Sequence, residues 1–406
     1  MKLSTKILGV CLALAMPRAE AATQEIRAMF QPDSSQPNKN VFVNQTPNSG
    51  YCAKYPGECA QNNMFSIQMP MRAPSLRPLL PGDGIPIKVP ANWRQLPVIN
   101  ADTQETEIVE VRIIGIGSEF ILSHSALDLA GGTDLRAAHQ ALWDSSSWVY
   151  APAPCQYSGV GAYSPTTYRF FWKAPVEAEC TKVANLSIPW MTFDTLDFAY
   201  ELRTPNPLGM SSGLYTGSIS YSIGPTGDFT FGPGFMPDDG NLTLDFVLDV
   251  QHTLKVDLPP GGNKVVLEPE GGWRSWLDSG RKPTRIFRDQ MFYISASSRF
   301  KVMLECEFSG LFDCLLKDPA TQRVTAVQLS ISLPDGLNGT DGQPIKRRYL
   351  RIGENEALGV RPNLYADRKV GTLHFEIPQT YMDFILRPGQ RDTYIGNVTV
   401  IWDSEA

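Results

Sequence analysis

The sequence predicts an all-β protein with two β-sandwich domains in tandem, and two observations support this. The segments 214–223 (LYTGSISYSI) and 393–402 (TYIGNVTVIW) are near duplicates, and each follows a turn that contains proline and glycine. After Tyr-x-Gly, apolar and polar side chains alternate in both, which is typical of a strand with one buried face. The 32 prolines and 33 glycines are spread along the chain, as expected for many short strands joined by turns.

Length and charge limit the class of protein. The 406 residues suffice for two or three domains at about 150 residues each. Charged residues make up 19% of the chain and the formal net charge is −6, so no broad basic surface argues for nucleic-acid binding.

The N-terminal segment 1–21 has the pattern of a secretory signal peptide. Lys2 and Lys6 precede an apolar run from Ile7 to Met16, and Ala19-Glu20-Ala21 is a small-x-small cleavage site. No later stretch approaches the ~20 apolar residues of a membrane-spanning helix. The sequence therefore predicts a secreted protein.

Cysteine usage agrees with an oxidising compartment. Six cysteines follow the signal segment, and an even number after such a segment predicts disulfides. Six cysteines allow fifteen connectivities, and proximity in sequence favours neighbouring pairs. The residues concerned are Cys52, Cys59, Cys155, Cys180, Cys306 and Cys314.

In the first half, the apolar run Ile108–Leu122 predicts a buried strand. One helix is expected after Gly131-Gly132, capped by Thr133 or Asp134, because Leu135, Ala138, His139, Leu142 and Trp143 fall on one face. Further strands are predicted at Tyr168–Trp172, Leu186–Trp190 and Leu196–Leu202.

The second half begins after a segment rich in glycine, proline and aspartate, which we interpret as a linker at 225–240. A long amphipathic strand is then expected over 242–258, where apolar residues share one parity and only His252 interrupts them. The predicted domains are therefore 22–224 and 241–406. Later strands are expected at Met291–Ile294, Phe300–Leu304, Val324–Leu333, Leu373–Ile377 and the C-terminal copy.

No motif for catalysis, cofactor binding or metal binding stands out. The four histidines lack ligand or triad spacing, and neither HExxH nor GxSxG occurs. We therefore predict a non-enzyme without cofactor or metal. Aromatic residues between 143 and 163 could line a sugar site, although core packing is the more common use. They are Trp143, Trp148, Tyr150, Tyr157 and Tyr163.

The order of these features resembles the CblD-like family of tip minor pilins from chaperone–usher pili, which includes the tip adhesin of colonization factor antigen I pili. The pair Cys52 and Cys59 and the pair Cys155 and Cys180 match two family disulfides. Leu186-Ser-Ile-Pro189 and Pro207-Leu-Gly209 stand where the family has similar segments. The most specific match is the ending 388–400, PGQRDTYIGNVTV, which is similar to the C-terminal strand of pilins.

The resemblance implies two immunoglobulin-like sandwiches, an adhesin domain followed by a pilin domain that lacks one strand. A donor strand from another subunit would complete the pilin domain by strand addition at an exposed edge. Implied partners are a periplasmic chaperone, an outer-membrane usher, the major pilin through its N-terminal strand, and a host glycan or protein receptor. The implied location is the fimbrial tip. The groove is expected to be lined or bordered by Tyr394, Val398, Val400 and Trp402.

Two features depart from the family. Cys306 and Cys314 match no family disulfide. The basic receptor patch of some members has no counterpart, because neither the residues just before Cys52 nor 224–230 contain arginine or lysine. The receptor-binding residues are therefore left unassigned. Two alternatives stay open: an assembly initiator without receptor binding, and a self-contained secreted β-sandwich that binds carbohydrate or belongs to the envelope.

Overall fold

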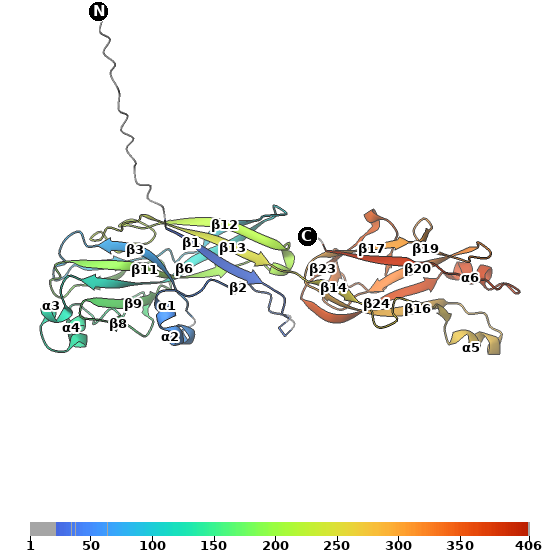
Figure 1. Cartoon of the computed structure of the whole chain (residues 1–406), viewed down its shortest axis with the longest axis horizontal. Coiled ribbons are helices and arrows are strands. Elements are labelled where there is room, and N and C mark those ends of the chain that lie inside the picture. The colour runs from blue at the N-terminus through green and yellow to red at the C-terminus, as the bar shows by residue number, and fades with distance from the viewer. Residues whose placement is uncertain (1–21, 34, 37, 63, 405–406) are drawn as a thin grey trace, which may run out of the picture.

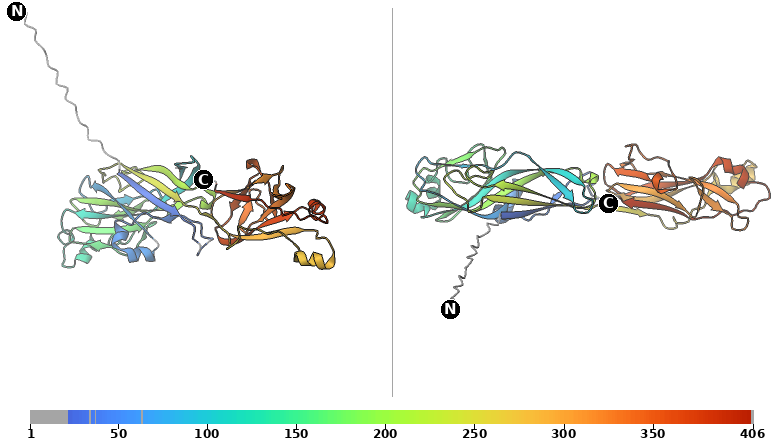
Figure 2. Two further views of the ribbon diagram at one scale, coloured as in Figure 1. Left: turned by 45° about the vertical axis from the view of Figure 1, so that its right-hand side comes forward. Right: turned by 90° about the horizontal axis from the view of Figure 1, so that it is seen from above.

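A computed structural model describes residues 22–404 except 34, 37 and 63; the expected signal segment lies outside the described residues. The protein is all-β, with several sheets and a few short helices. Figure 1 shows two bodies arranged end to end, and the second view in Figure 2 shows the same elongated arrangement. We call residues 22–250 the N-terminal body and residues 254–404 the C-terminal body.

The N-terminal body is one curved eleven-stranded sheet with the path β2-β1-β13-β12-β5-β6-β11-β3, on which β9 pairs with β6, β7 and β8. A second, two-stranded sheet joins β4 and β10. Ile26 of β1 and Met69 of β3 belong to one hydrophobic cluster, so the sheet curves around a common core. The strands of the two sheets of the N-terminal body are β1 (Ala22–Phe30), β2 (Val43–Asn44), β3 (Ile67–Pro74), β4 (Gly84–Ile87), β5 (Arg94–Asn100), β6 (Thr106–Leu122), β7 (Gln156–Tyr157), β8 (Ala162–Tyr163), β9 (Thr167–Lys173), β10 (Cys180–Val183), β11 (Met191–Arg203), β12 (Gly213–Ser222) and β13 (Asn241–Val250).

Short helices cover the ends and one side of this body. The predicted helix is α4 (Leu135–Ala141), and its cap is Asp134, whose side chain accepts a hydrogen bond from the Ala137 N–H. It packs beside α3 (Ala126–Ala130) at the end of the body far from the C-terminal body (Figure 1). The other helical segments are α1 (Tyr51–Lys54), α2 (Pro56–Gln61) and the 3₁₀ turn η1 (Pro207–Gly209).

The expected boundary between the two halves is corrected by the strand pairing. β13 pairs in parallel with β1 and antiparallel with β12, so residues 241–250 belong to the N-terminal body. The expected linker 225–240 also packs there. Its three phenylalanines Phe229, Phe231 and Phe235 are buried in the N-terminal core, which the glycine, proline and aspartate content of the segment did not reveal.

The C-terminal body contains two further sheets. One has the path β14-β16-β24-β20-β19-β18, with β15 on β16 and β22 on β20, and the other has the path β21-β23-β17-β25. Their strands are β14 (Leu254–Asp257), β15 (Glu268–Pro269), β16 (Ile286–Ala296), β17 (Phe300–Cys306), β18 (Phe308–Ser309), β19 (Cys314–Lys317), β20 (Val324–Ser332), β21 (Leu337–Gly339), β22 (Arg348–Leu350), β23 (Leu358–Pro362), β24 (Ala366–Ile377) and β25 (Val398–Ser404). Helices α5 (Gly272–Ser279) and α6 (Gln379–Ile385) lie at its far end, and η2 spans Glu354–Glu356 (Figure 1).

The two bodies meet at residues 251–253. The His252 ring lies 2.9 Å from the Met210 carbonyl oxygen in the N-terminal body and 3.1 Å from Ser297 Oγ in the C-terminal body. Arg299 donates to the Gly209 carbonyl oxygen at 3.2 Å. The residue that interrupts the alternation in the sequence is therefore the junction. Within the described residues, no helix has the length and apolar character needed to cross a bilayer.

Candidate functional site

The strand β25 forms an edge of the C-terminal body. It pairs antiparallel with β17, with Cys306 opposite Val398, Leu304 opposite Val400 and Val302 opposite Trp402. Among the described residues β17 is its only ladder partner. One long edge of β25 therefore presents unpaired backbone groups, which is the arrangement that accepts an additional strand.

An apolar groove of about 490 Å³ lies along this edge. Side chains from β14, β16, β19, β20, β24 and β25 line it, together with residues of the segment 258–267. The lining side chains include Val256, Leu258, Val265, Leu267, Phe292, Leu316, Val327, Leu373, Phe375, Val398, Val400 and Trp402.

Several apolar side chains in the groove are only partly covered. Val398, Val400 and Trp402 are half-buried, although their alternation marks them as the inward face of the strand. The Trp402 ring packs against Phe292 at 5.1 Å and Phe300 at 5.9 Å between ring centroids. The hydrophobic core of this body is thus open to solvent along the groove, at a cost proportional to the exposed apolar area.

The near-duplicate strand in the N-terminal body has a different environment. β12 pairs with β13 on one side and with β5 on the other. The apolar face of β13 is completely buried and fills the space next to β12. Its members are Leu242, Leu244, Phe246, Leu248 and Val250. The same strand pattern is therefore closed by a neighbour in one body and left open in the other.

Tyr394 differs from the three other residues expected at the groove. It precedes β25 and is not among the lining residues. Its hydroxyl donates to Asp392 at 3.0 Å, and burial together with this carboxylate raises its pKa to about 12. The adjacent Ile395 exchanges two backbone hydrogen bonds with Lys317 of β19, at 2.9 and 3.0 Å, which holds the approach to β25 in place.

Three disulfides join the neighbouring cysteines: Cys52–Cys59, Cys155–Cys180 and Cys306–Cys314. The third, which has no counterpart in the resemblance, connects β17 with β19. Cys306 lies opposite Val398 in the β17–β25 ladder. Leu316, two residues after Cys314, lines the groove. This disulfide therefore ties together two strands from different sheets at one end of the groove.

One histidine takes part in a hydrogen-bond chain that its sequence spacing did not predict. His374 of β24 lies 2.7 Å from Asp289 of β16 through Nδ1 and 2.8 Å from Ser332 of β20 through Nε2. Ser332 Oγ also accepts the Arg347 backbone N–H at 2.9 Å, and the Arg347 guanidinium lies 3.3 Å from Asp289. The chain thus attaches the segment before β22 to the sheet.

The five aromatic residues considered for a sugar site divide into two groups. Trp143 and Trp148 are buried in the N-terminal core, whereas Tyr150, Tyr157 and Tyr163 are 43–57% exposed.

No group of three or more side chains suited to metal binding lies together within the described parts of 22–404. The sequence analysis did not identify Val256 and Leu258 as groove-lining residues. The alternation of Leu254, Val256 and Leu258 was the pattern that could have indicated a strand with one apolar face there.

No family model matches the chain, and no curated protein matches it. Among solved structures, it is similar to CfaE, the adhesive subunit of the CFA/I fimbria of enterotoxigenic Escherichia coli, with 9% identity, 95% of this chain and 94% of that chain covered, and a TM-score of 0.28. A chaperone–tip adhesin complex of CFA/I fimbriae gives 11% identity, coverage of 95% and 97%, and a TM-score of 0.23. The CsuC–CsuE chaperone–tip subunit complex from archaic chaperone–usher Csu pili of Acinetobacter baumannii gives 10% identity and a TM-score of 0.24, with 94% of this chain and 98% of that chain covered.

Proposed function

We propose that this protein is a minor pilin at the tip of a chaperone–usher fimbria, where it initiates assembly and mediates adhesion. Residues 22–250 would be the adhesin domain, and residues 254–404 an immunoglobulin-like pilin domain that another subunit completes. This division replaces the boundary at 241 expected from the sequence, because β13 pairs within the N-terminal sheet.

The contrast between β12 and β25 is the observation that carries the proposal. β12 has strand neighbours on both edges, and the apolar face of the neighbouring β13 is completely buried. β25 has one ladder partner among the described residues, and an apolar groove lies at its other edge. A strand added between β25 and β14 would pair with the exposed backbone and bury the half-exposed Val398, Val400 and Trp402.

This groove defines the order of partners. An apolar groove exposed in the periplasm favours aggregation, so a periplasmic chaperone would occupy it first. At the outer-membrane usher, the N-terminal strand of the major pilin would replace the chaperone. The protein would then be carried through the periplasm to the cell surface and remain at the fimbrial tip, with its N-terminal body pointing outward and available to a host or surface receptor.

A thermal unfolding experiment tests the groove. Residues 22–406 are melted alone and with a synthetic peptide that copies the N-terminal strand of a pilin encoded in the same genome. A ligand that binds only the folded state at 100 times its Kd stabilises that state by about 2.7 kcal/mol. We expect a rise in the melting temperature of the C-terminal body, and no rise with a control peptide whose alternating apolar residues are replaced by asparagine.

A stable chain that is indifferent to the pilin peptide would contradict this proposal. That result would favour a self-contained secreted β-sandwich that binds carbohydrate or belongs to the envelope. Stabilisation by the peptide without any receptor binding would instead restrict the function to initiating assembly.

A further inference from the structure

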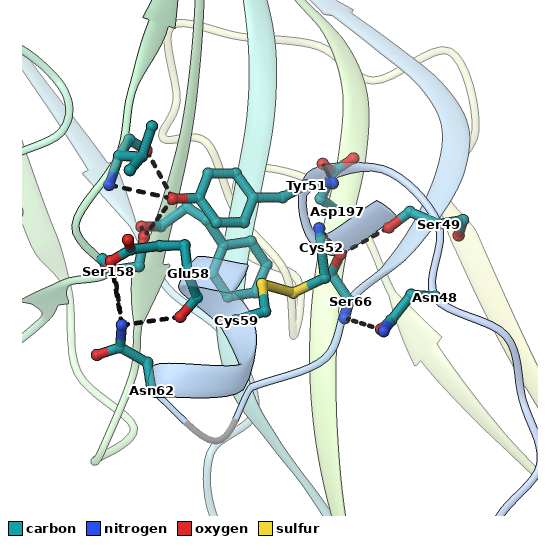
Figure 3. Close-up of a disulfide and its surroundings, with 12 residues drawn as sticks. Asn48, Ser49, Tyr51, Cys52, Glu58, Cys59, Asn62, Ser66, Ser158 and Asp197 are labelled. Atoms are coloured by element: carbon teal, nitrogen blue, oxygen red, sulfur yellow. Dashed lines mark hydrogen bonds between the residues drawn. A yellow bond between two sulfur atoms is a disulfide. The ribbon is translucent and has the colours of Figure 1, made fainter. Parts of the chain in front are cut away.

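A separate cleft, of about 530 Å³, lies in the N-terminal body, whereas the groove beside β25 lies in the C-terminal body. Two disulfide-bonded loops form it, one around Cys59 and the other around Cys155, together with the end of β9. Its lining is mostly polar: Glu58, Asn62, Ala151, Cys155, Gln156, Tyr157, Ser158, Gly159 and Lys173. Figure 3 shows Glu58 and Asn62 reaching from the Cys52–Cys59 loop toward Ser158.

The exposed ring of Tyr157 lines this cleft, and the exposed ring of Tyr150 lies next to it. The Tyr157 side chain is 57% exposed and that of Tyr150 is 46% exposed, and their ring centroids are 6.0 Å apart. Large aromatic side chains of the same segment, such as Trp148, are fully buried. Exposed aromatic faces carry negative charge density, which attracts the polarised C–H groups on the apolar face of a pyranose ring. Tyrosine also offers this contact at a low cost in side-chain entropy.

The polar groups in the cleft are arranged for hydroxyl recognition. Lys173 Nζ donates to Asn62 Oδ1 at 2.9 Å, and Asn62 Nδ2 lies 3.1 Å from Glu58 Oε1 and 3.2 Å from the Ser158 carbonyl oxygen. An ammonium group has three N–H donors and a carboxylate about four acceptor positions, so each retains capacity for a ligand. One positive and one negative side chain give the cleft no net charge, which favours a neutral ligand over an acidic one.

The cleft is held rigid from several directions. The disulfides Cys52–Cys59 and Cys155–Cys180 fix its two loops. Buried Lys182 donates to the carbonyl oxygens of Ser147 and Tyr150, both at 3.2 Å, which anchors the backbone that presents the Tyr150 ring. At Gly159, where φ is +122°, a Cβ atom would lie 1.7 Å from Glu58 Oε1, so glycine makes room for this carboxylate. Such pre-organisation reduces the entropy lost on binding.

From this arrangement we propose that the cleft binds a neutral sugar residue of a glycan, with the sugar ring stacked on Tyr157 and its hydroxyl groups bonded to Glu58, Asn62 and Lys173. The proposal rests on the adhesive part of the proposed function and specifies its ligand class and site. It does not depend on the groove beside β25, because the two sites lie in different bodies.

The experiment uses residues 22–406 on a printed array of unsialylated, sialylated and sulfated oligosaccharides, followed by titration with the strongest-binding glycan in free form. We expect binding to neutral glycans. Tyr157→Ala should weaken it about fivefold to tenfold because the stacking face is lost. Tyr157→Phe keeps the ring and should retain most of the affinity. Tyr163→Ala is the matched control, because Tyr163 is 43% exposed in the same body but does not line the cleft.

Three results would overturn the assignment: no binding to any printed glycan, binding only to sialylated or sulfated glycans, or binding that Tyr157→Ala leaves unchanged. Thermal unfolding of each variant shows whether a loss of binding reflects a loss of folding. Stabilisation by the pilin peptide combined with one of these results would leave the pilin proposal intact and remove only the sugar site. Failure of the peptide test together with glycan binding would do the reverse.

Discussion

Arg169 and Asp197 form an ion pair inside the N-terminal body, with 2.8 Å between Arg169 Nη1 and Asp197 Oδ2. Both side chains are almost completely buried. Asp197 Oδ2 also accepts the Tyr51 backbone N–H at 3.0 Å. Gly50 lies against this carboxylate, where a Cβ atom would be 2.7 Å from Asp197 Oδ2. The pair therefore fastens the Cys52–Cys59 loop, and with it one wall of the polar cleft, to the sheet.

Replacing Arg169 by methionine should destabilise the N-terminal body by about 3–5 kcal/mol, because it leaves a buried carboxylate unpaired. The double variant Arg169→Met/Asp197→Leu should lower the free energy of unfolding by less than the sum of the losses in the two single variants. Urea unfolding followed by tryptophan fluorescence measures these free energies. Arg72→Met is the matched control, because Arg72 pairs with Asp194 at the surface and such pairs contribute about 0–1 kcal/mol. Equal costs for Arg72→Met and Arg169→Met would contradict this interpretation.

The same variant should respond to pH. Burial raises the pKa of Asp197 to about 6, and Arg169 opposes this rise. Without the arginine the folded-state pKa of Asp197 rises further above its unfolded value. A raised acid pKa contributes stability at low pH that is lost as the pH increases through the folded-state pKa. The free-energy difference between wild type and Arg169→Met should therefore be smaller at pH 5 than at pH 8, and a difference independent of pH would argue against this carboxylate as the cause.

Acid should also weaken the junction between the bodies. Burial lowers the pKa of His252 below 6.5, and Arg299 contributes in the same direction, while the Met210 carbonyl oxygen opposes the shift. Because the unfolded chain then binds a proton more readily, the stabilisation is present above pH 6.5 and is lost as the pH falls through the lowered pKa. Unfolding free energies between pH 5 and 8 should show this loss in the wild type and a reduced loss in His252→Gln. Identical pH profiles would exclude His252 as the titrating group.

The groove predicts opposite results for two adjacent residues of β25. Val400 lines the groove, whereas Thr399 is exposed on the other face of the strand. Val400→Glu places a charge where the added strand would pack, and should abolish incorporation into fimbriae. Thr399→Glu should be incorporated normally. Surface labelling of fimbriae with an antibody against the N-terminal body measures both, and normal incorporation of Val400→Glu would contradict the proposed groove.

The chain Asp289–His374–Ser332 has the connectivity of a catalytic triad, yet we expect no nucleophilic activity. Ser332 Oγ is held by the Arg347 N–H, and the Arg347 side chain reaches Asp289. The Ser332 hydroxyl and the Asp289 carboxylate are thus both engaged by Arg347 and take part in attaching the segment before β22 to the sheet. A fluorophosphonate probe should leave Ser332 unmodified in intact-mass spectra. Modification of Ser332 that disappears in His374→Ala would contradict the non-enzymatic interpretation.

Local patterns in the sequence predicted most elements well, because alternation and capping depend on neighbouring residues. The strand expected at Leu186–Trp190 was wrong, since this segment holds only an isolated bridge between Ile188 and Leu79. The strand expected at Ile108–Leu122 is most of β6, and Asp134 was one of the two caps considered for α4. The run 242–258 was correctly predicted to be extended. Its division into β13 and β14 was not, since parity shows which face of a strand is buried but not which sheet supplies its neighbours.

The candidate sites show the same limit. Alternation pointed to Val398, Val400 and Trp402, but the contribution of Val256 and Leu258 to the groove lining depends on how the two sheets pack. The polar cleft could not be predicted either, because Glu58, Asn62, Tyr157 and Lys173 come from segments that only the folded sheet brings together. The positions of Phe229, Phe231 and Phe235 in the core were masked by the turn-forming residues around them.

In the proposed role, where the C-terminal body is anchored in a fimbria and the N-terminal body binds a surface, the pairing of β13 has a mechanical consequence. β13 leads directly into the junction at residues 251–253, and it is hydrogen-bonded along its length to β1 on one edge and to β12 on the other. A pull on the C-terminal body is therefore transmitted along β13 and loads both ladders in shear, so that many hydrogen bonds must break together rather than one after another. The strand between β1 and β12 in the N-terminal sheet is thus also the element through which tension would pass between the two bodies.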